Sequence, residues 1–430
     1  MHDDHARAVA AAPAAPPAAL PASAMLVLGS LTILGPLGTD AFLPALLAMS
    51  ADLGAPGAQI QLSLSGFTVG MAVGMLIAGP LSDGVGRRRP LVVGSLMMVA
   101  GGVAASLAPS LAALVACCVL MGLGASVCAV VSRAVVADSA EGPPLARAYS
   151  LLGTLTGLGP IAGPLSGVVA MALWGWRGIF ALLAVLGAIG CAGVLLRLPE
   201  TRPPQARLAH PFRSMPSGIL RALRSRPFRR AAAVLVCAFG GLFAYISASS
   251  FLVQSVLGLP PIAYSIVFGA NGLALTAAGV VAGRLARTMR PFAIVAIGLA
   301  IQAAGALLAL ATALTGTATP WTLLPALALI AGSFGLIFGT ATAAAVEELR
   351  DIAGTALAVC GAAQFAAAGL VSPLVGLGGE HDPRPFAITA AVCVALAWAS
   401  WILLRGRGSA PEPTAAPAGP EHEGARHGTA

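Results

Sequence analysis

Two charged residues lie inside long apolar segments, where charge is costly. Asp40 is the only acid well inside such a segment, and Arg133 lies near the end of another. An ionisable group in apolar surroundings is expensive and therefore a candidate for function. Burial favours the neutral form of a carboxyl, so Asp40 is a candidate for binding and releasing protons. The structural alternatives are a helix end beside Pro44 and an arginine side chain that reaches out to a surface.

The turn at residues 79–90, with the sequence GPLSDGVGRRRP, combines residue types that suit a gate. Gly79 and Gly86 permit a tight turn, and the aspartate suits the positive end of a neighbouring helix. Its arginines can pair with acids or phosphates and so hold one conformation reversibly. A plain basic loop is the alternative, but such a loop does not require this spacing. The candidate gate residues are Gly79, Asp83, Gly86, Arg87 and Arg88.

Uncharged polar and aromatic residues inside apolar segments could form a binding cavity. Their amide and hydroxyl groups can bond an amphiphilic ligand, while the phenylalanines offer apolar contact. Each is equally suited to tie two helices together. The cavity candidates are Phe67, Phe243, Tyr245, Asn271 and Gln364.

Composition indicates the elements that must position these residues. The chain has 430 residues, of which 58% are hydrophobic and 9% charged, and its mean hydropathy is +0.90. An ordinary soluble domain is roughly 25% charged. A spanning helix needs about 20 mainly apolar residues. The sequence predicts an all-α membrane protein with twelve spans, at residues 25–44, 60–80, 91–108, 112–136, 148–171, 178–197, 231–254, 262–283, 291–313, 320–345, 353–377 and 385–404.

Arginine placement predicts the orientation of these spans. All 24 basic residues are arginine. With a cytoplasmic N-terminus, 21 arginines fall in inner segments and 2, Arg177 and Arg384, in outer ones. Cytoplasmic loops carry the positive excess. We therefore expect both termini in the cytoplasm. The same distribution makes the net charge of +8 an orientation signal and excludes nucleic acid as a partner.

The spans divide into two bundles of six, at residues 25–197 and 231–404. A basic cytoplasmic linker at residues 198–230 joins them, and we expect disordered cytoplasmic tails at residues 1–24 and 405–430. A basic turn at residues 283–291 echoes the one at residues 79–90, which suggests a diverged repeat. Two six-span halves related by an axis along the membrane normal are typical of a transporter.

Catalytic and metal-binding patterns are missing from the sequence. The six histidines fall in tails or loops, and no HExxH or phosphate-loop pattern occurs. The seven cysteines fall inside apolar runs, which favours reduced packing residues over a metal site or disulfides. We expect no metal and no catalytic residues. An integral-membrane enzyme is therefore the weaker alternative.

Several blocks resemble the major facilitator superfamily, and within it the bicyclomycin/chloramphenicol-resistance (Bcr/CflA) drug:proton antiporters. Residues 79–90 resemble its motif A, except that Gly84 replaces the usual basic residue. Gly159, Pro160 and Gly163 resemble motif C, the antiporter motif. Residues 39–46 (TDAFLPAL), 133–138 (RAVVAD) and 243–251 (FAYISASSF) resemble blocks of the Bcr/CflA family. Together the blocks cover about residues 25–400.

The resemblance implies proton-coupled efflux of small amphiphilic drugs or antibiotics, similar to bicyclomycin or chloramphenicol, by alternating access. It implies a functional monomer in the bacterial inner membrane, in contact with lipid and driven by the proton gradient without a cofactor. Asp40 and Arg133 would take part in proton coupling. A proton-coupled exporter or importer of a small metabolite remains the alternative.

Overall fold

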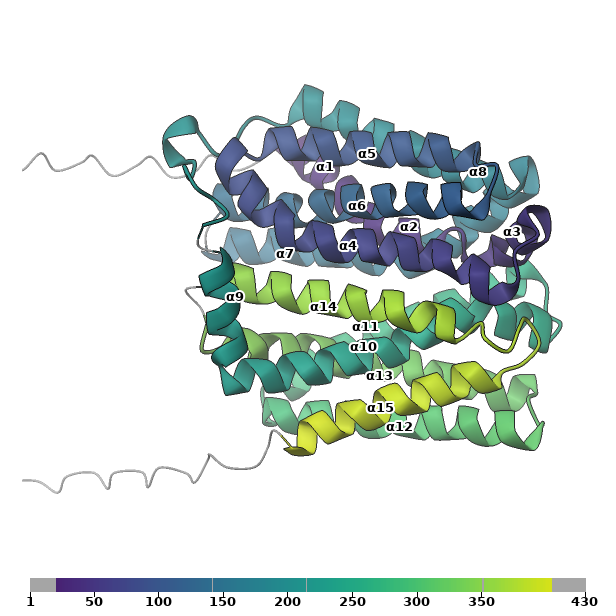
Figure 1. Ribbon diagram of the computed structural model, residues 1–430. Coiled ribbons are helices and arrows are strands. Elements are labelled where there is room, and N and C mark those ends of the chain that lie inside the picture. Colours follow the sequence, from purple (N-terminus) through teal and green to yellow (C-terminus); the bar gives the residue numbers. More distant parts are fainter. Residues whose placement is uncertain (1–20, 141, 214, 350–351, 404–430) are drawn as a thin grey trace, which may run out of the picture.

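The computed structural model describes residues 21–140, 142–213, 215–349 and 352–403, and within these ranges it contains helices and no strands. Figure 1 shows the helices side by side in two stacked groups. The N-terminal half contains α1 (Ala22–Thr32), α2 (Leu34–Asp40), the 3-10 turn η1 (Leu43–Ala45), α3 (Leu46–Leu53), α4 (Gly57–Val85), α5 (Arg88–Ser106), α6 (Leu111–Ser139), α7 (Gly142–Gly157) and α8 (Gly159–Arg197).

The C-terminal half follows a connection that contains the 3-10 turn η2 (Pro204–Ala206) and α9 (Met215–Arg224). It contains α10 (Arg226–Phe251), the π-helical turn η3 (Leu252–Val256), α11 (Pro261–Leu285), α12 (Pro291–Thr315), α13 (Pro320–Val346), α14 (Ala353–Leu374) and α15 (Arg384–Leu403). Helix α9 packs against α14 and α10 at one end of the bundle.

Among the described residues, eleven helical stretches are long and apolar enough to cross a membrane. One of them, Arg147–Arg197, is 51 residues long and is broken at Gly175, where φ is 68° and ψ is −176°. An uninterrupted span needs only about 20 residues, so this stretch supplies two spans. The twelve-span, all-α fold predicted from the sequence is confirmed, and the chain is a multi-pass membrane protein.

Several helices begin or end at other residues than predicted, and the local sequence explains the differences. The first predicted span, 25–44, is a broken helix that extends to Leu53, because Pro36 and Pro44 interrupt the regular hydrogen-bond pattern. Helix α10 begins at Arg226, within the predicted linker, because the Ser225 hydroxyl caps the N–H of Phe228. Residues 1–20 and 404–430 lie outside the described residues, so the predicted tails are not addressed.

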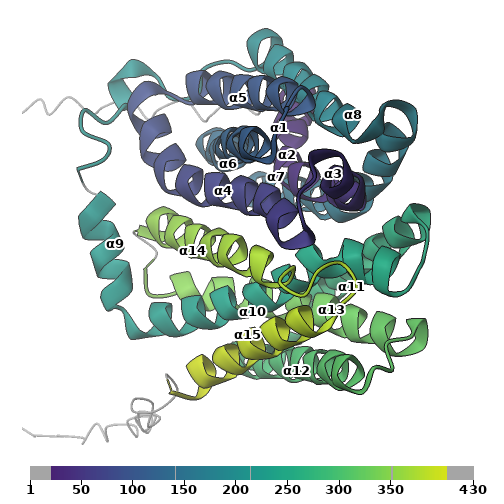
Figure 2. The same ribbon diagram turned by 45° about the vertical axis from the view of Figure 1, so that its right-hand side comes forward.

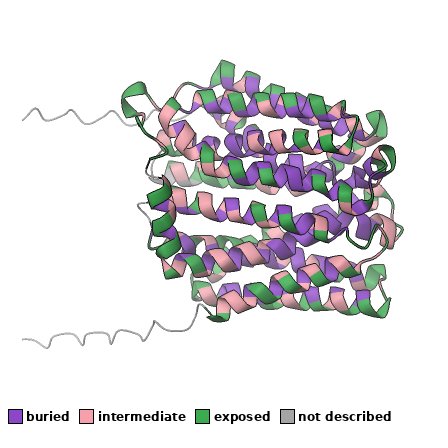
Figure 3. Ribbon diagram, viewed as in Figure 1, coloured by how far each residue is buried: buried purple, intermediate pink, exposed green. Residues whose placement is uncertain are grey.

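The helices bury small residues against one another and turn large apolar residues outwards. A Cβ placed on Gly94 would lie 2.9 Å from the carbonyl oxygen of Gly124, so α5 and α6 touch backbone to backbone. Exposed leucines occur along the spans, with Leu26 at 69% and Leu370 at 73% exposure. Figure 3 shows the buried positions between helices and the exposed ones on the outer surface. This is the pattern of a bundle whose solvent is lipid.

The helices run between two ends of the bundle, which we call the linker end and the far end. The linker end carries α9 and the turn between α4 and α5, on the left of Figure 1. The far end carries α3 and the turn between α14 and α15, on the right. Figure 2 shows α4 of one half beside α14 of the other, and α11 passes α8. These two helix pairs form the contact between the halves.

Candidate functional site

Asp40 ends α2 in the interior of the protein. It is 5% exposed, and its Oδ1 accepts a hydrogen bond of 2.9 Å from the Thr39 hydroxyl. Helix α8 approaches so closely that a Cβ on Gly163 would lie 2.8 Å from the Cβ of Asp40. The motif C glycine therefore lets α8 seal one side of the carboxylate.

The C-terminal half supplies a pair of polar side chains near Asp40. Tyr245 of α10 and Asn271 of α11 are both buried, and the Asn271 amide donates a 2.9 Å hydrogen bond to the Tyr245 hydroxyl. One segment of α8 lies against both sides, because Gly163 packs on Asp40 and Pro160 packs on Gly272, the residue after Asn271. Asp40, Tyr245 and Asn271, predicted as separate candidates, therefore form one polar cluster between the halves.

The motif C residues join this cluster to the contact between the halves. Pro160 of α8 packs on α11, where a Cβ on Gly272 would lie 2.8 Å from the Cβ of Pro160. Gly159 packs on Pro36 of α2. One short segment thus contacts the helix of Asp40 and, one residue further on, the helix of Asn271.

Arg133 occupies a different place from Asp40, on α6 towards the linker end. Its side chain is exposed. The hydroxyl of Tyr149 donates a 3.2 Å hydrogen bond to its backbone carbonyl. Asp40 is bonded to Thr39 rather than to Arg133.

The remaining cavity candidates are buried among helices. Phe67 is fully buried against Gly38 of α2. Phe243 belongs to an aromatic cluster around Phe239, which lies 5.6 Å from both Phe334 and Phe365 between ring centroids. Gln364 precedes Phe365 on α14 and is 6% exposed. Sequence reasoning missed Phe239 and Phe365, whose spacing gave no signal before the helices were placed.

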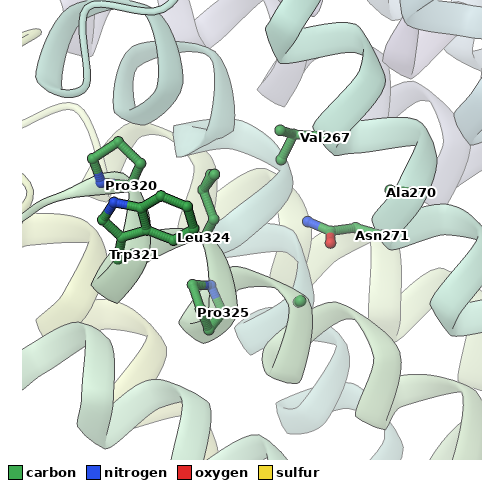
Figure 4. Close-up of a pocket in the computed structure, with 8 residues that line it drawn as sticks. Val267, Ala270, Asn271, Pro320, Trp321, Leu324 and Pro325 are labelled. Carbon is green, nitrogen blue, oxygen red and sulfur yellow. The ribbon is translucent and has the colours of Figure 1, made fainter.

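A groove of about 350 Å³ lies between α11 and α13 and includes one predicted cavity residue, Asn271. Figure 4 shows the Asn271 amide among apolar side chains, with Trp321 at the edge of the groove. Trp321 is 89% exposed, so the groove opens towards the surroundings of the bundle. The lining residues are Val267, Ala270, Asn271, Pro320, Trp321, Leu324, Pro325 and Ala328.

The motif A turn forms an ion-pair network centred on Arg87. The guanidinium lies 2.7 Å from Asp138 and 2.9 Å from Asp83, and it donates to the Ser82 hydroxyl. Burial lowers the pKa of Arg87, but hydrogen bonding to Asp138 and the charges of both carboxylates outweigh it and raise the pKa. Arg87 therefore stays charged while 5% exposed.

The connection between the halves completes this network, which sequence reasoning missed. Glu200 accepts hydrogen bonds from the backbone N–H groups of Arg87 and Arg88, at 2.8 and 3.3 Å. Arg202 lies 3.0 Å from Asp83. The available signal was composition, because Glu200 is the single acid in the basic residues 198–230.

Two motif A residues have partners other than those expected. Arg88 bonds the backbone carbonyl of Leu195 through its side chain, rather than an acid. Gly84 stands where the family has a basic residue, and a Cβ there would lie 2.7 Å from Pro211. The missing side chain therefore makes room for the linker. Gly79 has no atom within 4 Å of its Cβ position, whereas Gly86 has a φ of 94°, which favours glycine.

The close contact between the halves extends from the far end along both helix pairs. Along α14 and the turn after it, a Cβ on Gly376 would lie 2.7 Å from Ala58, and one on Gly369 would lie 3.1 Å from Thr68. A Cβ on Gly361 would lie 2.6 Å from the Sδ of Met75, whereas Gly354, nearest the linker end, has nothing within 4 Å. On the other side, Gly272 touches Pro160 and a Cβ on Gly157 of α7 would lie 3.6 Å from Thr276, whereas Gly153 has nothing within 4 Å. The close contacts between glycines and the other half therefore run from the far end as far as Gly361 and Gly157.

The model of the Major Facilitator Superfamily matches residues 28–373. The chain belongs to the major facilitator superfamily. A bicyclomycin resistance protein homolog of Haemophilus influenzae is 25% identical, over 89% of this chain and 96% of that protein. A chloramphenicol resistance protein of Pseudomonas aeruginosa is 30% identical, over 79% of this chain and 80% of its own. These relatives confirm the predicted resemblance to resistance proteins within the superfamily.

Solved major facilitator structures share the fold. The crystal structure of a peptide transporter in complex with alafosfalin superimposes with a TM-score of 0.69 at 16% identity, over 89% of this chain and 94% of its own. Membership of the superfamily makes this chain a transporter of small molecules and not an enzyme.

Proposed function

We propose that this major facilitator protein exports small amphiphilic drugs in exchange for protons. The observation that carries the proposal is the buried Asp40 packed against the motif C segment of α8, which also packs on the helix of Asn271 in the other half. A carboxylate held there by motif C can bind a proton, and the paired polar groups can bind a ligand. The resistance proteins among the relatives support drugs over metabolites as substrates.

The proposed orientation places the linker end in the cytoplasm and the far end outside the bacterial inner membrane. The arginine excess at the linker end supports it. The close packing of α14 on α4 from Gly376 to Gly361 supports a conformation that is closed at the far end, which is the outside in this orientation. Arg133, which is exposed on α6 towards the linker end, then lies on the cytoplasmic side.

Coupling follows from the energetic cost of charge. Protonation of Asp40 from outside lowers the cost of closing the site and returning inwards. Drug binding from the cytoplasm favours proton release, because both ligands act on one conformational equilibrium. No cofactor is required, and the proton gradient is the energy source. Both halves of the site come from one chain, which supports a functional monomer.

The gate proposal concerns motif A. In the described conformation Asp83 pairs with Arg87 and Arg202, so its ion pairs stay within the N-terminal half and the linker. We propose that the same acid and Arg87 close the cytoplasmic side in the outward-facing state. Asp83→Asn is then expected to reduce transport while leaving membrane insertion intact.

The test is a drug-susceptibility panel in a bacterial host that lacks its own efflux pumps. The host carries an empty vector, this protein or Asp40→Asn at matched membrane levels. We expect this protein to raise the tolerated concentration of one or more amphiphilic drugs and Asp40→Asn to remove that protection. A panel with no protection by the unaltered protein would overturn drug export and favour a metabolite as substrate.

A further inference from the structure

Gln61 is a fully buried amide that the proposed transport chemistry does not use. It lies on α4 near the far end and is 0% exposed. Its Nε2 donates a 2.7 Å hydrogen bond to the carbonyl of Ser247, and its Oε1 accepts one of 3.0 Å from Ser372. Ser247 belongs to α10 and Ser372 to α14. A side chain of one half is therefore bonded to two helices of the other half.

The surrounding packing makes these bonds depend on closure. Gly369 and Gly376 bring α14 and the turn after it against α4 on either side of Ser372. The amide of Gln61 has its protein partners only while this contact persists. When the far end opens, water replaces these partners, and a hydrogen bond within the protein is modestly more favourable than one to water. The bonds of Gln61 therefore favour the closed far end.

A second glutamine bridges the halves near the same end. Gln254 lies in the π-helical turn η3 and donates a 3.3 Å hydrogen bond to the carbonyl of Pro44 and one of 2.8 Å to Ser250. Single π-helical turns occur frequently at functional sites. Pro44 follows Asp40 by four residues, and Ser247 follows Tyr245 by two. Both bridges therefore attach to the segments that carry the polar cluster.

We propose that Gln61 is a positioning residue that holds the far end closed and sets how often the two halves separate there. This clasp consists of Gln61, Ser247 and Ser372. The assignment of the far end to the outside of the membrane rests on the proposed function. The role of the clasp in holding that end closed does not depend on it. Loss of its hydrogen bonds is expected to raise the ratio of far-end-open to far-end-closed molecules at least about fivefold.

A matched control exists within the chain. Gln302 of α12 is also 0% exposed, and its Nε2 donates a 3.0 Å hydrogen bond to the carbonyl of Ala238. Both residues belong to the C-terminal half. Removing this amide therefore costs one buried hydrogen bond between helices without touching the contact between the halves; the Oε1 of Gln302 has no partner to lose.

The experiment measures distances between spin labels in the full chain, on a background in which the native cysteines are replaced. Labels at Leu107 and Ile262 report on the far end, where both are exposed. Labels at Ala140 and Thr288 report on the linker end. Gln61→Leu is expected to lengthen the far-end distances and shorten the linker-end distances, whereas Gln302→Leu leaves both distributions as in the parent.

Two outcomes overturn the clasp: unchanged distributions in Gln61→Leu, or an equal shift in Gln302→Leu. If Gln61→Leu gives no folded protein, Ser372→Ala decides, because it removes one hydroxyl and is expected to shift the same ratio about twofold. The distances are recorded without drug or proton gradient. If Gln61→Leu shifts the distances but the unaltered protein exports no drug, the clasp is supported and the proposed function is rejected. If the unaltered protein exports drug but Gln61→Leu shifts no distance, the proposed function is supported and the clasp is rejected.

Discussion

Arg87 and Asp138 form a two-pronged ion pair that joins the start of α5 to the end of α6. The Nε of Arg87 lies 2.7 Å from Oδ2, and its Nη2 donates to Oδ1 at 3.3 Å. The arginine side chain is 6% exposed and the aspartate 23%. The turn between α4 and α5 is thereby fixed to a third helix, which gives motif A a structural role in this conformation beside its proposed role as a gate.

Asp138→Asn should lower the stability of the protein. A hydrogen bond to a charged group is worth about 2 kcal/mol, and Arg87 would keep only Asp83 as a carboxylate partner. Thermal unfolding in detergent at a fixed scan rate checks this, as a lower midpoint. Asp52→Asn is the control, because its pair with Arg177 is 42–47% exposed and a pair so open to water contributes little to stability. Equal midpoints for the two variants would contradict a stabilising role for the Arg87 pair.

Asp40→Asn should abolish proton-driven accumulation while allowing downhill exchange of drug. The amide keeps the size of the carboxyl but cannot bind and release a proton. Inverted vesicles with an imposed pH gradient measure uphill uptake, and preloaded vesicles measure exchange. If the variant still accumulates drug to the level of the parent, the coupling carboxylate lies elsewhere, with Asp83 and Asp138 as the next candidates.

Gly163→Ala should impair transport strongly. The added methyl group would lie 2.8 Å from the Cβ of Asp40, so α8 would have to move away from the carboxylate. Gly153→Ala is the matched control on α7, because its Cβ position has nothing within 4 Å. Drug efflux rates at equal membrane levels compare the two, and similar rates would show that close packing at Asp40 is dispensable.

Glu200→Gln should loosen the linker. The neutral amide loses the charge that attracts Arg207 and weakens the acceptor for the N–H groups of Arg87 and Arg88. Trypsin, which cuts after arginine, should then cleave the linker several-fold faster than in the parent. Gln205→Ala changes an exposed neighbour and should leave the rate unchanged. An unaltered rate in Glu200→Gln would mean that other contacts hold the linker in place.

The predicted orientation can be tested by labelling a single cysteine in the linker. Gln205→Cys on a cysteine-free background places a thiol at an exposed position. A membrane-impermeant thiol reagent should label it only after the cells are permeabilised. Thr317→Cys, at the far end, should react in intact cells. The opposite pattern would reverse the assignment of inside and outside.

The sequence alone determined the number of spans, their division into halves and the identity of Asp40 and Arg87 as unusual charges. These features follow from local rules: apolar length, arginine placement and a charge inside an apolar run. The superfamily and its resistance-protein branch were also predicted from short blocks, and the relatives confirm them. The break of the first span at Pro36 and Pro44 was local as well, but composition gave no reason to extend that helix to Leu53.

Only the tertiary structure decided which residues meet. Asp40 packs against Gly163, Glu200 binds the N–H groups of Arg87 and Arg88, and Gln61 bonds Ser247 and Ser372. The partners in each case are more than a hundred residues apart in the chain. Their contacts arise because glycines such as Gly163 and Gly369 let particular helices approach one another. Hydropathy records that a helix is buried in the membrane but not which helix covers it, so these pairings required the packed bundle.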